Sequence, residues 1–355
     1  MVVEKDIVAI SIPFSAGVVT AALLPPGSDA LWTVAGGASL AAAGLLCLLS
    51  GRGNRTAGIL VLYYLLGLFC AAGSSLGLPP PARPSRLAER GLDVLLDAID
   101  GAGFPHTGTA ALLKALMAGR RGALDRATVE TFRAAGASHI LALSGLHLGI
   151  LYGLLQKALS WLGRSRPAQV LRSTACIGAA AFYLAMTGAS PSLVRAFLFI
   201  LFNELSRLLP GRRRRPLNIF CAALTIQLAV SPGVVRTLGF QLSYLAVLGI
   251  CLLHPRLEAW YPPGSRLDPL RRIWSAAALT LSCQAFTAPL VWIRFHTFPK
   301  YFLLTNLGAL PLTEGFMVAA LPAVLVPGCP QAIKNLADTL GQMLLSFLET
   351  VASIP

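Results

Sequence analysis

The sequence predicts an all-α fold, a polytopic bundle of transmembrane helices joined by interfacial amphipathic helices. Hydrophobic residues make up 55% of the chain and charged residues only 12%, whereas soluble domains are roughly one-quarter charged. Apolar runs recur along the chain, and a run of about 20 residues is needed to cross the hydrocarbon core of a bilayer. Only helices and closed barrels satisfy their backbone hydrogen bonds in lipid. We count about ten candidate segments and expect some of them to be broken or re-entrant. They are residues 7–24, 30–50, 57–78, 138–161, 169–188, 191–209, 216–232, 237–254, 274–293 and 301–327.

The first region, residues 1–78, holds three of these runs and is predicted to be a three-helix membrane region. Its first run has the length of a signal peptide's apolar part, but Glu4-Lys5-Asp6 precedes it and no convincing small-residue cleavage site follows. We expect this run to be retained as a helix.

Residues 79–137 interrupt the hydrophobic pattern and are predicted to form an extracytoplasmic or interfacial amphipathic helical segment. Within them Leu92 and Ile99 share one helical face, while Asp93 and Asp100 lie on the other. This pattern is typical of a helix at the membrane surface.

The membrane channel core is expected to span residues 138–327 and to be followed by a C-terminal amphipathic helix at 328–355. Pro311 and Pro322 lie in the last run of the core and predict a broken helix or a re-entrant pair there. The C-terminal helix is predicted to carry an apolar stripe, with Asp338 and Glu349 on the opposite, exposed face. The stripe consists of Ile333, Leu336, Leu340, Met343, Leu344 and Phe347.

The formal net charge of +14 is explained mainly by membrane orientation. With the N-terminus inside, the connections on that side are rich in Lys and Arg, whereas the short connections outside hold only Arg236, Arg294 and Lys300. This is a positive-inside bias, which predicts a multi-pass protein of the bacterial cytoplasmic (inner) membrane, in contact with membrane lipid.

Metals, cofactors and disulfides are not expected. The seven cysteines form no CxxC pair and lie in or beside apolar runs, where small packing residues are common.

Polar residues within apolar sequence form a first cluster at His139, Ser144 and His147. On an unbroken helix the two histidines are about 12 Å apart, too far for one metal ion unless the helix breaks at Ser144-Gly145. Ser144 and His147 also resemble a nucleophile and its base, but no orienting acid is evident. A third alternative is a secondary transporter for a smaller anion, with His139 or His147 as a proton relay.

A second cluster surrounds Ser190-Pro191, which has the form of a helix start with Ser190 as N-cap. Ser192 and Arg195 follow within the first turn and would give this end a positive character that suits a phosphate. The alternative is that Arg195 reaches toward lipid headgroups.

The remaining clusters are Gln241 with Ser243, and Asn306. Gln241 and Ser243 also fit ordinary interhelical hydrogen bonds, and Phe240 and Tyr244 fit core packing or base stacking. Since the polar groups unexplained by topology gather toward the outer half, a funnel for an anionic polymer is a reasonable interpretation.

Four stretches, in order, resemble the signature motifs of the ComEC-type competence channels. They are His139-Ile-Leu-Ala-Leu-Ser-Gly-Leu-His147, Thr187-Gly-Ala-Ser-Pro-Ser-Leu-Val-Arg-Ala196, Gly239-Phe-Gln-Leu-Ser-Tyr-Leu-Ala-Val-Leu-Gly249 and Asn306-Leu-Gly-Ala-Leu-Pro-Leu312. The resemblance covers roughly residues 105–315 and implies import of single-stranded DNA during natural transformation. It implies a path lined by His139, Ser144, His147, Ser190, Ser192, Arg195, Gln241, Ser243 and Asn306, with Arg195, Arg236, Arg294 and Lys300 attracting phosphate at the outer mouth.

The resemblance also implies partners: an extracytoplasmic DNA receptor, a separate nuclease and a cytosolic ATPase motor. The chain has no Gly-Lys-Ser/Thr phosphate-binding loop, no strand-rich OB-like insertion and no His-x-His-x-Asp-His motif. We therefore expect a non-enzymatic channel core without these appended domains.

Overall fold

The computed structural model describes residues 2–23, 36–37, 39–40, 52–74, 85–163, 165–208, 215–262, 268–296 and 298–354. All regular structure in these ranges is helical, which confirms the predicted all-α class. The chain divides into two compact units, residues 1–83 with 201–251 and residues 84–200 with 252–355.

The described part of the first unit contains α-helices and a 3-10 turn. They are α1 (Val2–Leu23), α3 (Arg52–Ser74), α11 (Pro216–Val230), the 3-10 turn η3 (Pro232–Arg236) and α12 (Leu238–Leu252). The predicted run at 30–50 lies almost entirely outside the described residues.

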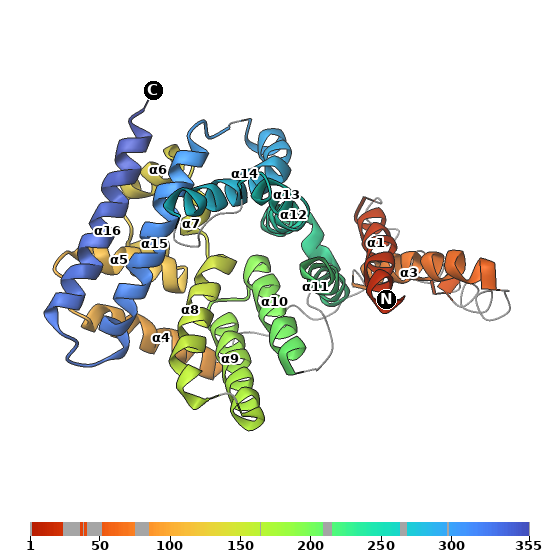
Figure 1. The fold of residues 1–355 in the computed structure, drawn as a ribbon, viewed down its shortest axis with the longest axis horizontal. Coiled ribbons are helices and arrows are strands. Elements are labelled where there is room, and N and C mark those ends of the chain that lie inside the picture. The colour runs from red at the N-terminus through yellow and green to blue at the C-terminus, as the bar shows by residue number, and fades with distance from the viewer. Residues whose placement is uncertain are drawn as a thin grey trace. The chain divides into compact units, whose positions relative to one another are not determined.

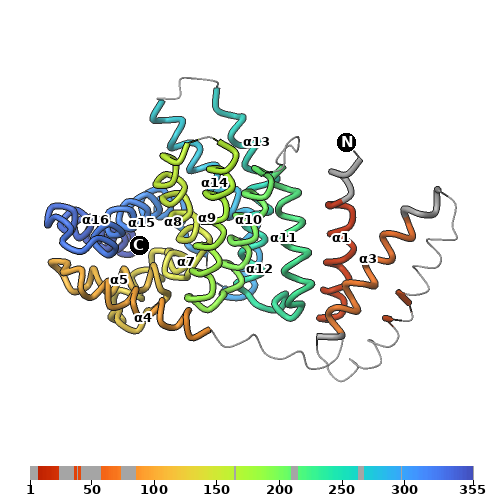
Figure 2. Tube along the Cα trace, turned by 90° about the horizontal axis from the view of Figure 1, so that it is seen from below, coloured from red at the N-terminus to blue at the C-terminus, as the bar shows by residue number. Residues whose placement is uncertain are grey.

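The second unit contains the predicted signature stretch at 138–147 and the C-terminal helices. Its elements are α4 (Arg86–Gly101), α5 (Thr107–Ala118), η1 (Arg121–Ala123), α6 (Arg126–Ala134), α7 (Ser138–Leu141), α8 (Gly145–Ala158), η2 (Leu159–Leu162), α9 (Arg166–Met186), most of α10 (Pro191–Leu208), α13 (His254–Glu258), α14 (Pro269–Phe295), α15 (Phe302–Leu325) and α16 (Gln331–Ala352). Helices α8, α9 and α10 lie side by side in Figure 1 and Figure 2, as do α15 and α16.

Two described helices, α14 and α15, are long and apolar enough to cross a membrane. Helices α11 and α12 have 15 residues each, so each is about 22 Å long, shorter than the roughly 30 Å of a hydrocarbon core. The count of ten spans is therefore not confirmed by the described residues.

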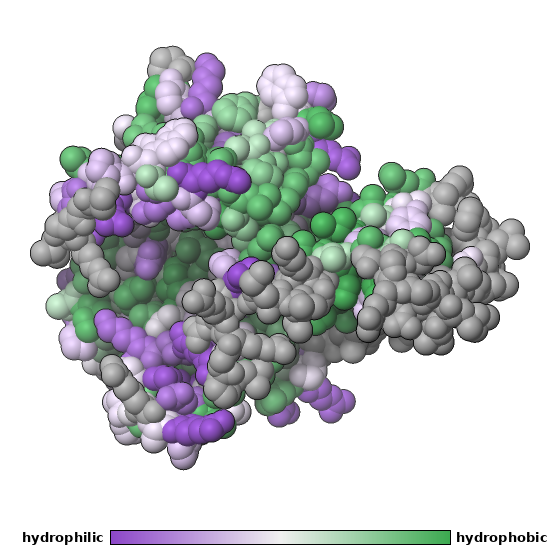
Figure 3. Space-filling view, turned by 45° about the vertical axis from the view of Figure 1, so that its right-hand side comes forward, coloured by the Kyte–Doolittle hydropathy of each residue, from purple (hydrophilic) through white to green (hydrophobic). Residues whose placement is uncertain are grey.

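In the second unit, at the left of Figure 3, hydrophilic side chains gather at the upper and lower margins around a hollowed, mostly apolar surface.

In the first unit, α1 and α3 come into close backbone contact at two glycines, one on each helix. A side chain at Gly17 would overlap the backbone of Tyr64, and one at Gly67 would overlap the carbonyl of Phe14. Small residues allow helix backbones to approach in this way. These two positions therefore set the spacing of the α1 and α3 pair.

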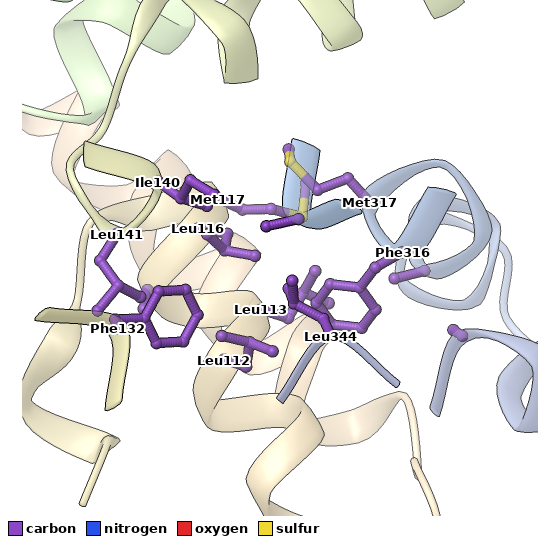
Figure 4. Close-up of a cluster of buried hydrophobic side chains, with 14 of the residues drawn as sticks. Leu112, Leu113, Leu116, Met117, Phe132, Ile140, Leu141, Phe316, Met317 and Leu344 are labelled. Carbon is purple, nitrogen blue, oxygen red and sulfur yellow. The ribbon is translucent and has the colours of Figure 1, made fainter. Parts of the chain in front are cut away.

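The main core of the second unit is built around α5. Figure 4 shows Leu113 and Leu116 of this helix directed toward Phe316 and Met317 of α15, with Leu344 of α16 beside them. All five side chains are almost completely buried. Burial of each such side chain contributes about 1.5–3 kcal/mol, so α5 fixes the position of α15 in this unit.

Helix α4 packs along the same unit with only part of its predicted apolar face. Leu92 and Ile99 are buried, but Leu87 is 68% exposed. A side chain at Gly91 would overlap the ring of Phe182 on α9, which shows that this face lies against the carboxyl end of α9. Its location at a membrane surface stays a prediction.

Helix α15 is continuous from Phe302 to Leu325 although it contains Pro311 and Pro322. The prediction of a broken helix or re-entrant pair at 301–327 is therefore wrong. Packing against α16 and α5 keeps α15 helical through both prolines, because most helical stability in proteins comes from tertiary packing.

The buried face of α16 differs from the predicted stripe. Ala337, Gly341 and Leu344 are buried, whereas Leu336 and Met343 are more than half exposed. The buried face also includes a carboxylate, Asp338. The predicted stripe is therefore wrong by part of a turn, because Asp338 lies on the buried face and not on the exposed one.

Asp338 is buried because it receives hydrogen bonds at the amino end of α5. Its Oδ2 lies 2.5 Å from Nδ1 of His106, and its Oδ1 accepts from the Thr109 hydroxyl at 2.5 Å and from the His106 backbone N–H at 3.2 Å. A carboxylate at a helix amino end is also favoured by the helix dipole. Asp338 thus joins α16 to α5.

We expect Asp338→Asn to lower the unfolding free energy by about 2 kcal/mol at neutral pH, since it weakens hydrogen bonds to a charged group. Burial raises the pKa of Asp338, but the hydrogen bonds from Thr109 and His106 outweigh it and hold the pKa below its ordinary value. The stabilisation is therefore complete above the unfolded-state pKa of about 4 and is lost as pH falls through the lower folded-state pKa. Thermal unfolding of the purified chain from pH 7 downward measures the difference between wild type and variant.

The matched control is Glu349→Gln, an exposed position on the same helix, which should leave the unfolding temperature unchanged. If the difference in unfolding temperature between wild type and Asp338→Asn stays constant into the acid range, the assigned stabilising role of the Asp338 carboxylate is contradicted.

Candidate functional site

The stretch that carries the first polar cluster is not one helix. Helix α7 ends at Leu141, Ala142 is extended, and α8 begins at Gly145 with Ser144 as its N-cap. The helix is thus broken just before Gly145, so the 12 Å separation that holds for an unbroken helix does not apply. Because the backbone turns at 142–144, the groups on both sides of the break can face a common region.

Side chains satisfy the backbone at both sides of this break. The Nε–H of Arg121 donates to the carbonyl of Leu141 at 3.0 Å. At the start of α8, the Ser144 hydroxyl accepts from the N–H of Leu146 at 3.3 Å, and Nδ1 of His147 accepts from the N–H of Ser144 at 3.1 Å. This is a capping box, so the break is a stable feature of the fold.

The same geometry favours helix capping over a nucleophile and base pair. The Ser144 hydroxyl is 3.3 Å from Nδ1 of His147, but that nitrogen already accepts the Ser144 N–H. The other ring nitrogen, Nε2, is buried and has no hydrogen-bond partner in the described part of the chain. No acid therefore orients the ring from that side, as the triad arrangement requires.

His139 lies beside the break, and its side chain is exposed. It interacts with the backbone of Gly136 and with the side chain of Asn306. It also interacts electrostatically with His147. The Oδ1 of Asn306 is buried and accepts no hydrogen bond from the described residues. The first cluster and Asn306, 167 positions further along the chain, are thus brought together.

The amino end of α15 is held at this position by the turn between α6 and α7. The Thr305 hydroxyl donates to the carbonyl of Ala135 at 2.8 Å. Gly136 has a positive φ of 74°, and a side chain there would overlap Pro299. These contacts place Asn306 against His139.

The second cluster joins the site through the first turn of α10. The N–H of Leu193 donates to the Ser190 hydroxyl at 3.4 Å, which confirms Ser190 as a cap. A Cβ added at Gly145 would lie 3.1 Å from the Cβ of Ala196 and 3.5 Å from Nη2 of Arg195. The amino end of α8 is therefore next to Arg195, which also interacts with Cys283 of α14.

The third cluster belongs to the first unit. Nη2 of Arg236 donates to the carbonyl of Ala22 near the end of α1 at 2.7 Å, and Nε2 of Gln241 donates to the carbonyl of Val235 at 2.8 Å. Ser243 is half-buried. Arg236 and Gln241 thus each donate to a backbone carbonyl within the first unit.

The aromatic residues beside this cluster are packed inside the first unit. Phe240 and Tyr244 are almost fully buried with ring centroids 4.5 Å apart, and the Tyr244 hydroxyl donates to Gln227 at 2.8 Å. Core packing explains both rings, and they do not present faces for base stacking.

The other predicted cations lie on the surface. Arg294 and Lys300 are exposed, near the carboxyl end of α14 and in the turn before α15. Ser192, at the start of α10, is half-buried.

The described residues contain no group of three or more His, Cys, Asp or Glu that could hold a metal ion. Six cysteines in the described ranges are free thiols.

Two residues with structural roles were not predicted from the sequence. In the second unit, Arg121 donates to the last carbonyl of α7. Glu204 is fully buried and lies 3.1 Å from Arg207 of the same helix; a single acid within the apolar run 191–209 was the available signal.

The comparisons with known proteins give one family. The family model described as Competence protein matches residues 116–355, which is more than half of the chain and includes the whole site.

Two curated relatives are similar over much of this chain. ComE operon protein 3 of Bacillus subtilis strain 168 is 25% identical over 246 residues, 68% of this chain. The uncharacterized protein YcaI of Escherichia coli strain K12 is 26% identical over 224 residues, 61% of this chain. The aligned part is 29% of the length of each relative. No solved structure matches.

Proposed function

Since this chain belongs to the Competence protein family, the ComEC type, we propose that it acts in DNA uptake as a membrane channel core that imports single-stranded DNA. The observation that carries the proposal is the convergence at the α7–α8 break. His139, Ser144 and His147 meet Arg195 from α10 and Asn306 from α15 there.

The chemistry of this group suits a polyanion. Arg195 supplies a planar cation whose N–H groups match phosphate oxygens. Multi-site, weak contacts permit conduction, since strong single contacts would stop it. Hydrogen bonds to the sugar-phosphate backbone carry no sequence information, which is appropriate for uptake of any strand.

In this proposal Arg195, Arg236, Arg294 and Lys300 attract phosphate from the outer side of the bacterial cytoplasmic membrane. Ser190, Ser192, Gln241 and Ser243 complete the path, in which about ten segments are expected to contribute. An extracytoplasmic receptor, a separate nuclease and a cytosolic ATPase motor would deliver, trim and draw the strand.

The test is complementation of a transformable strain that lacks its own competence channel. We expect the wild-type chain to restore uptake of labelled DNA, and Arg195→Ala and Arg236→Ala to abolish it while both proteins remain inserted in the membrane. Arg126→Ala, an exposed position on α6, is the matched control and should support normal uptake.

Normal transformation by both Arg195→Ala and Arg236→Ala would falsify the channel proposal. Uptake of a small anion by liposomes containing the purified chain, without DNA uptake in cells, identifies a permease instead. Because Arg236 also caps α1, Arg195 is the more informative of the two positions.

A further inference from the structure

The amino end of α8 contains a buried hydrogen-bond donor that nothing in the described structure satisfies. Nδ1 of His147 accepts the N–H of Ser144, so it carries no proton in the neutral ring. The proton of the neutral ring is therefore on Nε2. This atom is buried, in a side chain with no exposed surface, and has no acceptor among the described residues. A buried donor without a partner costs about 1–3 kcal/mol and calls for an acceptor from a ligand.

The charges at the helix break favour an anion as that ligand. A helix carries a partial negative charge at its carboxyl end and a partial positive charge at its amino end. At the end of α7 the guanidinium of Arg121 donates to the Leu141 carbonyl, so a full positive charge compensates the negative end. At the start of α8 the capping groups, Ser144 and His147, are neutral in the bonding pattern observed. The positive end of α8 is therefore left without a compensating anion in this capping arrangement.

A second element brings another donor group to the same end. The position that a Cβ of Gly145 would occupy is 3.5 Å from Nη2 of Arg195. The absence of a side chain at Gly145 lets the guanidinium from α10 approach the backbone at the α8 start. Donor groups of two helices thus lie near the amino end of α8.

We propose that the amino end of α8 binds one phosphate group of the DNA backbone, with the Nε2–H of His147 and the guanidinium of Arg195 as donors. The inference rests on the proposed function and names the point where the strand is held. In this proposal the oxygen approaches His147 past His139, which is exposed and interacts with His147. Gly145 lets Arg195 come close to the start of α8, and Arg121 caps the preceding helix α7.

Two substitutions of His147 separate phosphate binding from helix capping. Glutamate and glutamine both serve at the third position of a capping box, so both retain the acceptor for the Ser144 N–H. His147→Gln also keeps an N–H donor, whereas His147→Glu removes the donor and adds a negative charge. A purely structural role predicts that a variant loses binding only where its unfolding temperature also falls, since burial of the added carboxylate costs stability.

The experiment measures binding of a labelled single-stranded oligonucleotide to the purified full chain at several salt concentrations, together with the unfolding temperature. We expect His147→Gln to bind within about threefold of wild type and His147→Glu to bind at least about tenfold more weakly, with similar unfolding temperatures. Because the added carboxylate of His147→Glu offsets the charge of Arg195 at this phosphate, the slope of log K against log salt should also fall by about 0.7. The same variants are then titrated with inorganic phosphate alone.

The outcomes distinguish this inference from the proposed function. If the oligonucleotide binds wild type and His147→Glu with equal affinity and salt slope, the phosphate site is overturned while DNA passage stands. If inorganic phosphate binds wild type but not His147→Glu, and no oligonucleotide binds wild type, the site stands and DNA passage is overturned. If the wild-type chain binds neither inorganic phosphate nor the oligonucleotide, the phosphate site and DNA passage are both overturned.

Discussion

Substitution of Gly67 by leucine is expected to separate α1 from α3 and to unfold the first unit. Any side chain at Gly67 overlaps the carbonyl of Phe14, and a backbone group cannot rotate away as a side chain can. Overpacking of a well-packed core costs about 1–3 kcal/mol and occasionally more. We expect a loss of more than about 3 kcal/mol because the backbones themselves must move apart. The measurement is thermal unfolding of the purified chain, with limited trypsin digestion to locate the change.

The matched control is Gly178→Ala on α9, where an added Cβ meets no atom within 4 Å. A helical alanine is favoured over glycine by about 1 kcal/mol, so this variant should unfold at the same or a slightly higher temperature. A Gly67→Leu protein with wild-type unfolding and digestion would show that the α1 and α3 contact is not needed for stability.

Substitution of Gly145 by valine is expected to reduce DNA uptake about ten- to hundredfold. The added Cβ lies 3.1 Å from that of Ala196 and 3.5 Å from Arg195 Nη2, and the two methyl groups of valine extend further toward α10. Arg195 must then move from the amino end of α8. A hydrogen bond to a charged group contributes about 1.5–3 kcal/mol, which corresponds to this range of affinity. Transformation frequency in the complemented strain measures the effect, with membrane insertion checked by immunoblot.

Gly149→Val is the control for this prediction, because it places the same residue one turn further along α8, where an added Cβ meets nothing within 4 Å. Its uptake should remain within about threefold of wild type. Equal loss at Gly145 and Gly149 would attribute the effect to the helix propensity of α8 and would contradict a specific contact with α10.

The elements themselves were largely predictable because their signals are local. Composition and apolar runs predicted an all-helical chain, and Ser190 before Pro191 predicted the start of α10, since a cap and its N–H groups lie within four residues. The four signature stretches, read in order, identified the family that the comparison then found over residues 116–355. The number of membrane segments was less predictable, because hydropathy does not define where a helix begins and ends.

The errors came from contacts between residues that are distant in sequence. Pro311 predicted a break, yet α15 continues through it because α5 and α16 pack against it. The real break, at 142–144, has no proline; it depends on Arg121 reaching the carbonyl of Leu141 from twenty residues away. Asp338 was assigned to the exposed face of its helix because its partners, His106 and Thr109, lie more than 220 residues earlier.

The sequence by itself determined the helical class, the family and the residue types of the candidate site, because each depends on short-range pattern. Only the tertiary structure decided which of the polar residues meet. It placed Arg195 and Asn306 with His139 and His147 at a helix break, and it assigned Arg236 and Gln241 to capping contacts in another unit. The physical reason is that polar groups in apolar surroundings are stabilised by whichever partners the packing of distant helices brings within hydrogen-bond distance.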